Sequence, residues 1–108
     1  MFTCSRRNPR VYCGAPGRIE GPQGAIRGTV RNLSRGGSFF LSTHLLPVGH
    51  SFDMQIQLPG AEPIRAVGEV RYHHQYAEGV GMGIRFVRLG GADLSQISQF
   101  VDSRAGLS

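Results

Sequence analysis

Apolar and polar residues alternate with a period of two along most of this chain, which is the pattern of β-strands that bury one face. The longest such run covers residues 51–58. Pro59-Gly60 follows it, and residues 64–72 alternate again. We therefore predict a hairpin of two strands. The core-facing positions of its second strand are expected to be Ile64, Ala66, Gly68, Val70 and Tyr72.

Shorter runs complete the strand pattern. Residues 26–31, 38–42 and 82–87 alternate in the same way. Residues 11–13 and 18–20 form a weaker run that glycine and proline interrupt, which suits a strand with a bulge or bend. Six strand-like runs within about ninety residues predict a small β-barrel or a β-sandwich.

The period changes only near the C-terminus. Apolar residues recur at helical spacing from Leu94 to Val101, and Asp93 with Gln96 resembles a capping box. We predict one amphipathic helix over residues 93–103. Its apolar stripe either covers the core of its own domain or serves as an interaction surface.

Composition agrees with a turn-rich β protein, because 16 of the 108 residues are glycine. All twelve basic residues are arginine, against seven acids, for a net charge of +5. Seven of the arginines lie in the first 35 residues, where Glu20 is the one acid, so the positive charge is concentrated in the first third. Such a field attracts phosphates, nucleic acid or an acidic protein surface.

Enzymatic and metal sites are disfavoured. Cys4 and Cys13 are too few for a structural zinc site, and no acid is spaced to complete a site with any of the four histidines. We expect reduced thiols, no catalysis, and neither a metal nor a cofactor. No apolar stretch approaches the ~20 residues that cross a bilayer, and no leader-like run is present, so we expect a cytoplasmic protein.

A polar turn joins the second and third predicted strands and contains Asn32, Ser34, Gly36 and Gly37. The glycine pair permits positive φ, and successive N–H groups in such a turn can converge on an anion. Asn32 and Ser34 would share one face and hold a base edge or a phosphate. Taken alone, the turn is better interpreted as a plain hairpin connection.

The N-terminal segment carries the other polar cluster. Pro9 favours an extended chain, on which Arg6 and Arg10 face one side and Arg7 the other. A guanidinium can bind guanine O6 and N7 with its fork, stack on a purine or pair with a phosphate. The alternative for this segment is a solvated basic tail.

Together the two segments resemble the bipartite signature of the PilZ domain family. Arg6-x-x-x-Arg10 is similar to its RxxxR motif, and Asn32-x-Ser34-x-x-Gly37 to its [D/N]xSxxG motif. The resemblance spans nearly all 108 residues, including Gly37-Ser38-Phe39-Phe40-Leu41, residues 49–58, Gly68-Glu69-Val70-Arg71 and Gly81-Met82-Gly83-Ile84-Arg85-Phe86.

The resemblance implies a mainly β fold, a small six-stranded antiparallel β-barrel with a short C-terminal α-helix. It divides the chain into a flexible N-terminal segment (1–10), a barrel (11–91), and a helix with its tail (92–108). It also implies binding of the bacterial second messenger cyclic di-GMP. The site residues implied by position are Arg6 and Arg10 as a clamp, Asn32, Ser34 and Gly37 as its second half, and Arg7, Arg35 and Gly36 as auxiliaries.

Two departures bear on affinity and stoichiometry. Ser5 stands where some family members have a further arginine, which leaves open whether one or two nucleotides bind. Asn32 in place of Asp removes a negative acceptor for guanine N–H groups, so a lower affinity is expected.

The resemblance further suggests a stand-alone adaptor. In this interpretation the N-terminal segment is mobile without ligand, folds onto the barrel when the nucleotide binds, and signals to a separate, unidentified partner protein. Two alternatives remain: a PilZ-like scaffold that binds a pilus or motility protein without nucleotide, and a small basic barrel that binds RNA or DNA. The second is disfavoured by the scarcity of aromatic residues expected on exposed strand faces.

Overall fold

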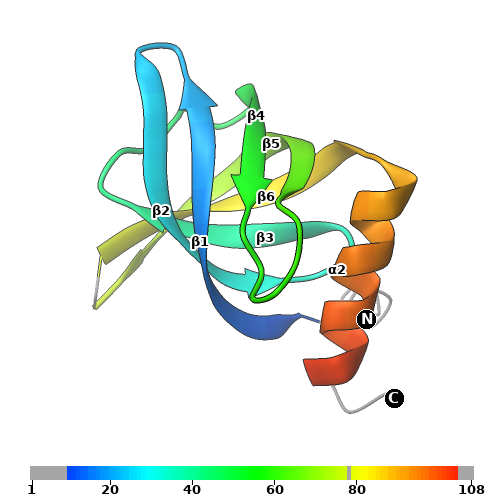
Figure 1. The fold of residues 1–108 in the computed structure, drawn as a ribbon. Helices are drawn as coiled ribbons and strands as arrows, with labels where there is room; N and C mark the ends of the chain where they lie inside the picture. The colour runs from blue at the N-terminus through cyan, green and yellow to red at the C-terminus, as the bar shows by residue number, and fades with distance from the viewer. Residues whose placement is uncertain (1–9, 78, 105–108) are drawn as a thin grey trace, which may run out of the picture.

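The computed structural model describes residues 10–77 and 79–104, and in this part of the chain six β-strands are followed by one α-helix. Figure 1 shows their arrangement. The elements are β1 (Val11–Gly21), β2 (Gly24–Leu33), β3 (Gly37–Ser42), β4 (Ser51–Ile56), β5 (Ile64–Tyr76), β6 (Gly79–Leu89) and α2 (Gly91–Arg104).

The strands form a closed antiparallel barrel in the order β1-β2-β3-β6-β5-β4. The predicted six-stranded barrel is therefore confirmed, and the sandwich alternative is excluded. The predicted hairpin is β4 with β5, in which Met54 lies opposite Ala66. Strand β5 continues to Tyr76, beyond the predicted end at residue 72, because it pairs there with the first half of β6.

The apolar face of each alternating strand fills the barrel. Leu58 lies just beyond the end of β4 and is still buried. Burying one such side chain stabilises the fold by about 1.5–3 kcal/mol. The core residues that are almost completely buried are Ile19, Val30, Leu33, Phe40, Met54, Ile56, Ile64, Val70, Met82, Ile97 and Val101.

A β-bulge in β5 redirects one aromatic side chain. The pairing passes from Val70 opposite Ile84 to Tyr72 opposite Gly83, so Arg71 is an extra residue. This insertion turns Tyr72 to the outside, where it is 40% exposed. The prediction that Tyr72 faces the core was wrong, because one inserted residue reverses the faces of every position that follows it.

A second bulge lies in β1, where the interrupted pattern predicted one. Tyr12 lies opposite Asn32 but Ala15 opposite Val30, so β1 has one extra residue. Gly14 lies within this bulge at φ 64°, a conformation that favours glycine. The two weak runs are therefore one continuous strand.

Helix α2 lies against one side of the barrel, next to the turn between β2 and β3 (Figure 1). Ile97 and Val101 are buried, whereas Leu94 is 39% exposed. The helix begins two residues before the predicted start, so Asp93 lies in its first turn and does not cap it. The Asp93 carboxylate instead accepts the Arg65 backbone N–H at 3.4 Å. No helix in the described ranges is long and apolar enough to span a membrane.

Arg35 links this turn to the helix. Its Nε donates a hydrogen bond to Ser98 Oγ at 3.0 Å, and its Nη2 donates to Asp102 Oδ1 at 2.7 Å. The ion pair is partly exposed, with 31% of the Arg35 side chain and 40% of the Asp102 side chain accessible. Helix and turn are thus held together by polar contacts as well as by apolar packing.

The barrel closes where β3 meets β6, and the approach is closest at Gly37. This residue lies opposite Arg85, and a Cβ atom added to it would collide with the backbone oxygen of Ile84. The neighbouring Gly36 carbonyl accepts the Phe86 N–H at 2.9 Å. Only glycine fits at position 37 without moving one strand away from the other.

Gly37→Ala is expected to destabilise the protein by about 1–3 kcal/mol, because the added methyl group overpacks this contact. The melting temperature should fall by at least about 4 °C in thermal unfolding. Gly91→Ala is the matched control, since its added Cβ has no atom within 4 Å. It should leave the melting temperature unchanged or slightly higher. Equal melting temperatures for the two variants would contradict this prediction.

Asp102→Asn tests the link between turn and helix, because it keeps the size of the side chain and removes its charge. Since the pair is partly exposed, the loss of stability should be about 1 kcal/mol or less. Hydrogen exchange should become faster in α2 and stay unchanged in β4. Ser103→Ala, at the exposed neighbouring position, is the control. Unchanged exchange in α2 would show that the link contributes nothing.

Candidate functional site

The turn between β2 and β3 is held together by Ser34, whose side chain is buried. Ser34 Oγ accepts the N–H groups of Gly36 and Gly37, each at 3.2 Å, and donates to the Gly37 carbonyl at 3.2 Å. The Ser34 backbone N–H donates to the same carbonyl at 2.9 Å. A serine hydroxyl that bonds its own turn in this way fixes the shape of that turn. In this structure Ser34 therefore acts on the conformation of the site.

The two glycines serve a different purpose from the one expected. The described residues with positive φ are Gly14, Gly24, Gly49, Gly60 and Gly79, so Gly36 and Gly37 do not adopt the positive φ that glycine permits. Their N–H groups converge, as expected of such a turn, but on Ser34 Oγ. Gly37 is needed for the close contact with β6 described above.

Asn32 lies at the end of β2, between Tyr12 of β1 and Phe39 of β3. A bulge at Arg31 precedes it, since Val30 lies opposite Phe40 and Asn32 opposite Phe39. The Asn32 side chain is partly buried, and its Oδ1 atom is buried without a hydrogen-bond partner. An unpaired buried acceptor of this kind costs about 1–3 kcal/mol, so it marks a position where a donor would be favourable.

Arg10 is brought to the same end of the barrel by the pairing of β1 with β2. Val11 lies opposite Leu33 in the antiparallel pairing. Arg10, just before Val11, is therefore on the same side of this pair as Ser34, just after Leu33. Arg10 is exposed, and its Nη1 lies 3.5 Å from the Tyr72 hydroxyl, at the limit of a hydrogen bond. The strand register therefore brings Arg10, the last residue of the RxxxR motif, next to the segment from Asn32 to Gly37. Arg6 and Arg7 lie outside the described residues.

An aromatic cluster covers the outside of the barrel next to these residues. The Phe39 ring contacts the rings of Tyr72, His74 and Tyr76, with centroids 5.0 to 6.4 Å apart, and the Arg31 guanidinium lies 4.5 Å from the Tyr76 centroid. Phe39 is 1% exposed although it lies outside the barrel core. The cluster leaves part of the Tyr72 ring accessible beside Arg10.

Two glycines of β6 make room for these rings. A Cβ at Gly81 would collide with the Phe39 ring, and one at Gly83 with the Tyr72 ring. Aromatic rings that lie over glycine on a neighbouring strand protect its exposed backbone. The strand pattern of the sequence did not predict this cluster. Its available signal was the spacing of Tyr72, His74 and Tyr76 by two residues, followed by Gly81 and Gly83 on the next strand.

Arg35, expected as an auxiliary of the site, is occupied by α2 through Ser98 and Asp102. Its position still matters, because it lies between Ser34 and Gly36 in the turn. Two hydrogen bonds from its side chain therefore connect the turn to the helix. The structure thus connects Arg35 to the site through the conformation of the turn.

Groups that could act chemically are sparse near this site. Burial raises the pKa of the Cys13 thiol, so the thiol form is favoured over the nucleophilic thiolate. The His73 and His74 rings diverge, since His73 Nε2 lies 2.7 Å from the Leu46 carbonyl while His74 joins the aromatic cluster. Residues 10–77 and 79–104 contain no group of three metal-ligating side chains. The arrangement suits binding, through guanidinium donors, an amide acceptor and an aromatic face.

Comparison with known proteins places this arrangement in a family. The model of the PilZ domain matches residues 5–103. A comparison with curated protein sequences gives no match.

Several solved structures share the fold. The Bacillus subtilis inhibitor of motility MotI/DgrA is 21% identical with a TM-score of 0.85, over 95% of this chain and 52% of that protein. The PilZ domain of YcgR from Escherichia coli, solved with cyclic di-GMP, is 13% identical with a TM-score of 0.78, over 94% of this chain and 92% of that domain. MrkH from K. pneumonia, also solved with cyclic di-GMP, is 15% identical with a TM-score of 0.78, over 91% of this chain and 50% of that protein.

The chain thus spans about half the length of MotI/DgrA and of MrkH, and nearly all of the YcgR domain. At these identities the likeness shows a common fold. The match to the family model extends from residue 5 to residue 103, a range that contains all six strands. This chain belongs to the PilZ domain family.

Proposed function

We propose that this protein is a receptor for cyclic di-GMP, which binds outside the barrel where β1 begins and the turn between β2 and β3 lies. The observation that carries the proposal is the strand register, because Tyr12 opposite Asn32 places Arg10 beside the second motif. Membership of the PilZ family supports it, as do the YcgR and MrkH structures solved with this nucleotide.

Arg10 and Tyr72 would bind one guanine and its phosphate. The Arg10 guanidinium can donate two parallel hydrogen bonds to guanine O6 and N7 or to a phosphate. Tyr72 lies within reach of Arg10, with its ring partly exposed. A purine that stacks on this ring would remain beside the guanidinium. Arg6 of segment 1–10 would complete the clamp with Arg10, and Arg7 would be an auxiliary.

Asn32 would read the guanine edge. Its buried Oδ1 has no partner, and guanine carries N–H donors on its Watson–Crick edge. The Asn32 Oδ1 atom has already lost its contact with water when the chain folds. A ligand N–H that donates to it would therefore satisfy this acceptor without a further desolvation cost. Ser34 and Gly37 would contribute indirectly, by giving the turn its shape and its distance from β6.

The response to ligand would involve both ends of the chain. The nucleotide would draw segment 1–10 against the barrel, and a separate partner protein would recognise the altered surface. Arg35 provides a second route, because it joins the turn directly to Ser98 and Asp102 of α2. In this proposal the protein acts as an adaptor without catalytic chemistry.

Arg10→Ala should weaken cyclic di-GMP binding at least about tenfold, since a hydrogen bond to a charged group contributes about 1.5–3 kcal/mol. Isothermal titration calorimetry measures the affinity and the stoichiometry together. Arg6→Ala should have a similar effect. Arg27→Ala, at an exposed position of β2 away from the turn, should bind like the original protein. Equal affinities for Arg10→Ala and Arg27→Ala would disprove the clamp, and no binding by the unmodified chain would favour the nucleotide-independent scaffold.

Asn32→Leu separates ligand recognition from folding. The variant keeps the approximate size of the side chain and removes the unpaired acceptor, so its melting temperature should stay unchanged or rise. Its affinity for cyclic di-GMP should fall about threefold to tenfold, the value of one neutral hydrogen bond. A lower melting temperature with unchanged affinity would assign Asn32 to the fold alone.

A further inference from the structure

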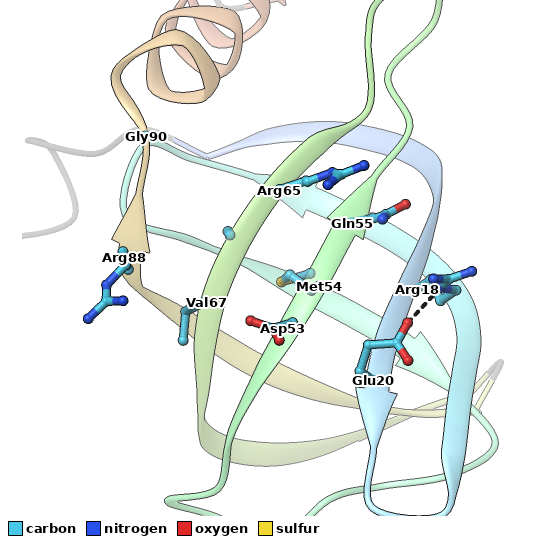
Figure 2. A pocket seen from close by; sticks show the side chains of 10 residues that line it. Arg18, Glu20, Asp53, Met54, Gln55, Arg65, Val67, Arg88 and Gly90 are labelled. Atoms are coloured by element: carbon cyan, nitrogen blue, oxygen red, sulfur yellow. Dashed lines mark ion pairs between the residues drawn. The ribbon is translucent and has the colours of Figure 1, made fainter.

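The outer face of the barrel also carries a groove of about 510 Å³ that the motifs do not touch. Figure 2 shows it from close by. It crosses β1, β4, β5 and the end of β6, and reaches Gly90 just before α2. Its lining residues include Arg18, Glu20, Asp53, Arg65, Val67 and Arg88.

The strand pairing arranges these side chains in two rows across the sheet. In the first row Gln55 lies between Arg18 of β1 and Arg65 of β5. In the second row Val67 lies between Asp53 of β4 and Arg88 of β6. Outward-facing residues of paired strands are neighbours, so each row forms a continuous strip of side chains.

Charges in the groove are unevenly paired. Arg18 Nε lies 2.8 Å from Glu20 Oε2, so one arginine already has its carboxylate. Within residues 10–77 and 79–104, neither the Arg65 nor the Arg88 side chain has a hydrogen bond or an ion pair. Asp53 is the remaining acid of the groove. The groove therefore presents an excess of positive charge around a small apolar centre at Val67.

The centre of the groove, on β4 and β5, lies across the barrel from the turn between β2 and β3. In the closed order β1-β2-β3-β6-β5-β4, strand β4 is three places from β3 in either direction, and β5 is three places from β2. A molecule in the groove would thus leave the turn between β2 and β3 accessible. The groove is suited to a partner that binds together with a ligand at the motifs.

We propose that this groove binds a short acidic segment of a partner protein. Carboxylates of the segment pair with Arg65 and Arg88, and an apolar side chain between them packs on Val67. Neighbouring strands lie about 4.8 Å apart, so four strands span about 14 Å, which is the length of about four extended residues. Guanidinium groups bind carboxylates with two parallel hydrogen bonds, and this accounts for specificity for acids.

The test uses a blocked pentapeptide of alternating glutamate and leucine, titrated into ¹⁵N-labelled protein at low salt and followed by NMR. Amide signals of Gln55, Val67 and Arg88 should shift, and binding should weaken as salt is raised. The Arg65→Glu/Arg88→Glu double variant should bind the peptide with an affinity at least about tenfold lower. Saturating cyclic di-GMP should leave the peptide affinity unchanged.

The controls address the peptide, the variant and the fold. A pentapeptide with glutamine in place of glutamate should cause little shift. Arg71→Glu, an exposed arginine six residues along β5 from Arg65, should bind like the original protein. Thermal unfolding should show that the double variant is folded, and its calorimetric titration with cyclic di-GMP should be unchanged.

Four results of the peptide titration would overturn the proposal. They are equal shifts with the glutamine peptide, equal weakening by Arg71→Glu, shifts confined to residues 34–37, and the absence of any shift at millimolar peptide. Shifts of the groove signals with protein concentration alone would instead indicate self-association and would equally overturn it. Each result concerns the peptide, so it remains distinct from failure of the nucleotide titration.

Discussion

The close approach of β3 to β6 is the contact on which the remaining structure depends. These strands are far apart in the sequence, and their pairing closes the barrel. Gly37 permits the approach, because any larger residue would meet the Ile84 carbonyl. The same pairing places Phe39 opposite Gly83, where the aromatic cluster forms on the outside. Closure of the barrel and construction of the site therefore rest on a common geometric requirement.

The turn between β2 and β3 combines rigidity with communication. Ser34 holds its internal shape through hydrogen bonds to Gly36 and Gly37, and Arg35 extends outward to α2. Arg35 belongs to this turn, so the turn and the helix are joined through its side chain. The motif segment from Asn32 to Gly37 thus contains a serine that shapes the turn. It also contains Arg35, which links the turn to the helix. A ligand that moves the turn would be sensed at the C-terminal end of the described chain.

The barrel also separates its two proposed surfaces. Around the turn between β2 and β3 lie the Arg10 guanidinium, the unpaired Asn32 acceptor and, from the second half of β5, the ring of Tyr72. The β4–β5 side has a charged groove around Val67. The residues of the two proposed surfaces do not overlap, so a ligand and a partner would be able to bind this one small domain at the same time.

Local pattern was sufficient for much of this description. Period-two alternation in the sequence predicted the strands. Gly14 and its neighbours predicted the bulge of β1, and the spacing of Ile97 and Val101 predicted the buried face of the helix. These features depend on residues adjacent in sequence or one turn apart, so the sequence carries them directly. The two motifs, at Arg6-x-x-x-Arg10 and Asn32-x-Ser34-x-x-Gly37, were likewise sufficient to suggest the family.

Tertiary structure decided the orientation and partners of individual side chains. The bulge at Arg71 turned Tyr72 from the core to the surface, Ser34 bonded its own turn, and Arg35 paired with Asp102 sixty-seven residues away. The register of β1 against β2 brought Arg10 to the turn, and the pairing of β4, β5 and β6 placed Arg65 and Arg88 in one groove. Each of these outcomes depends on pairing between distant strands or on a single inserted residue. Alternation along one strand contains no information about either, which is why only the folded chain determines them.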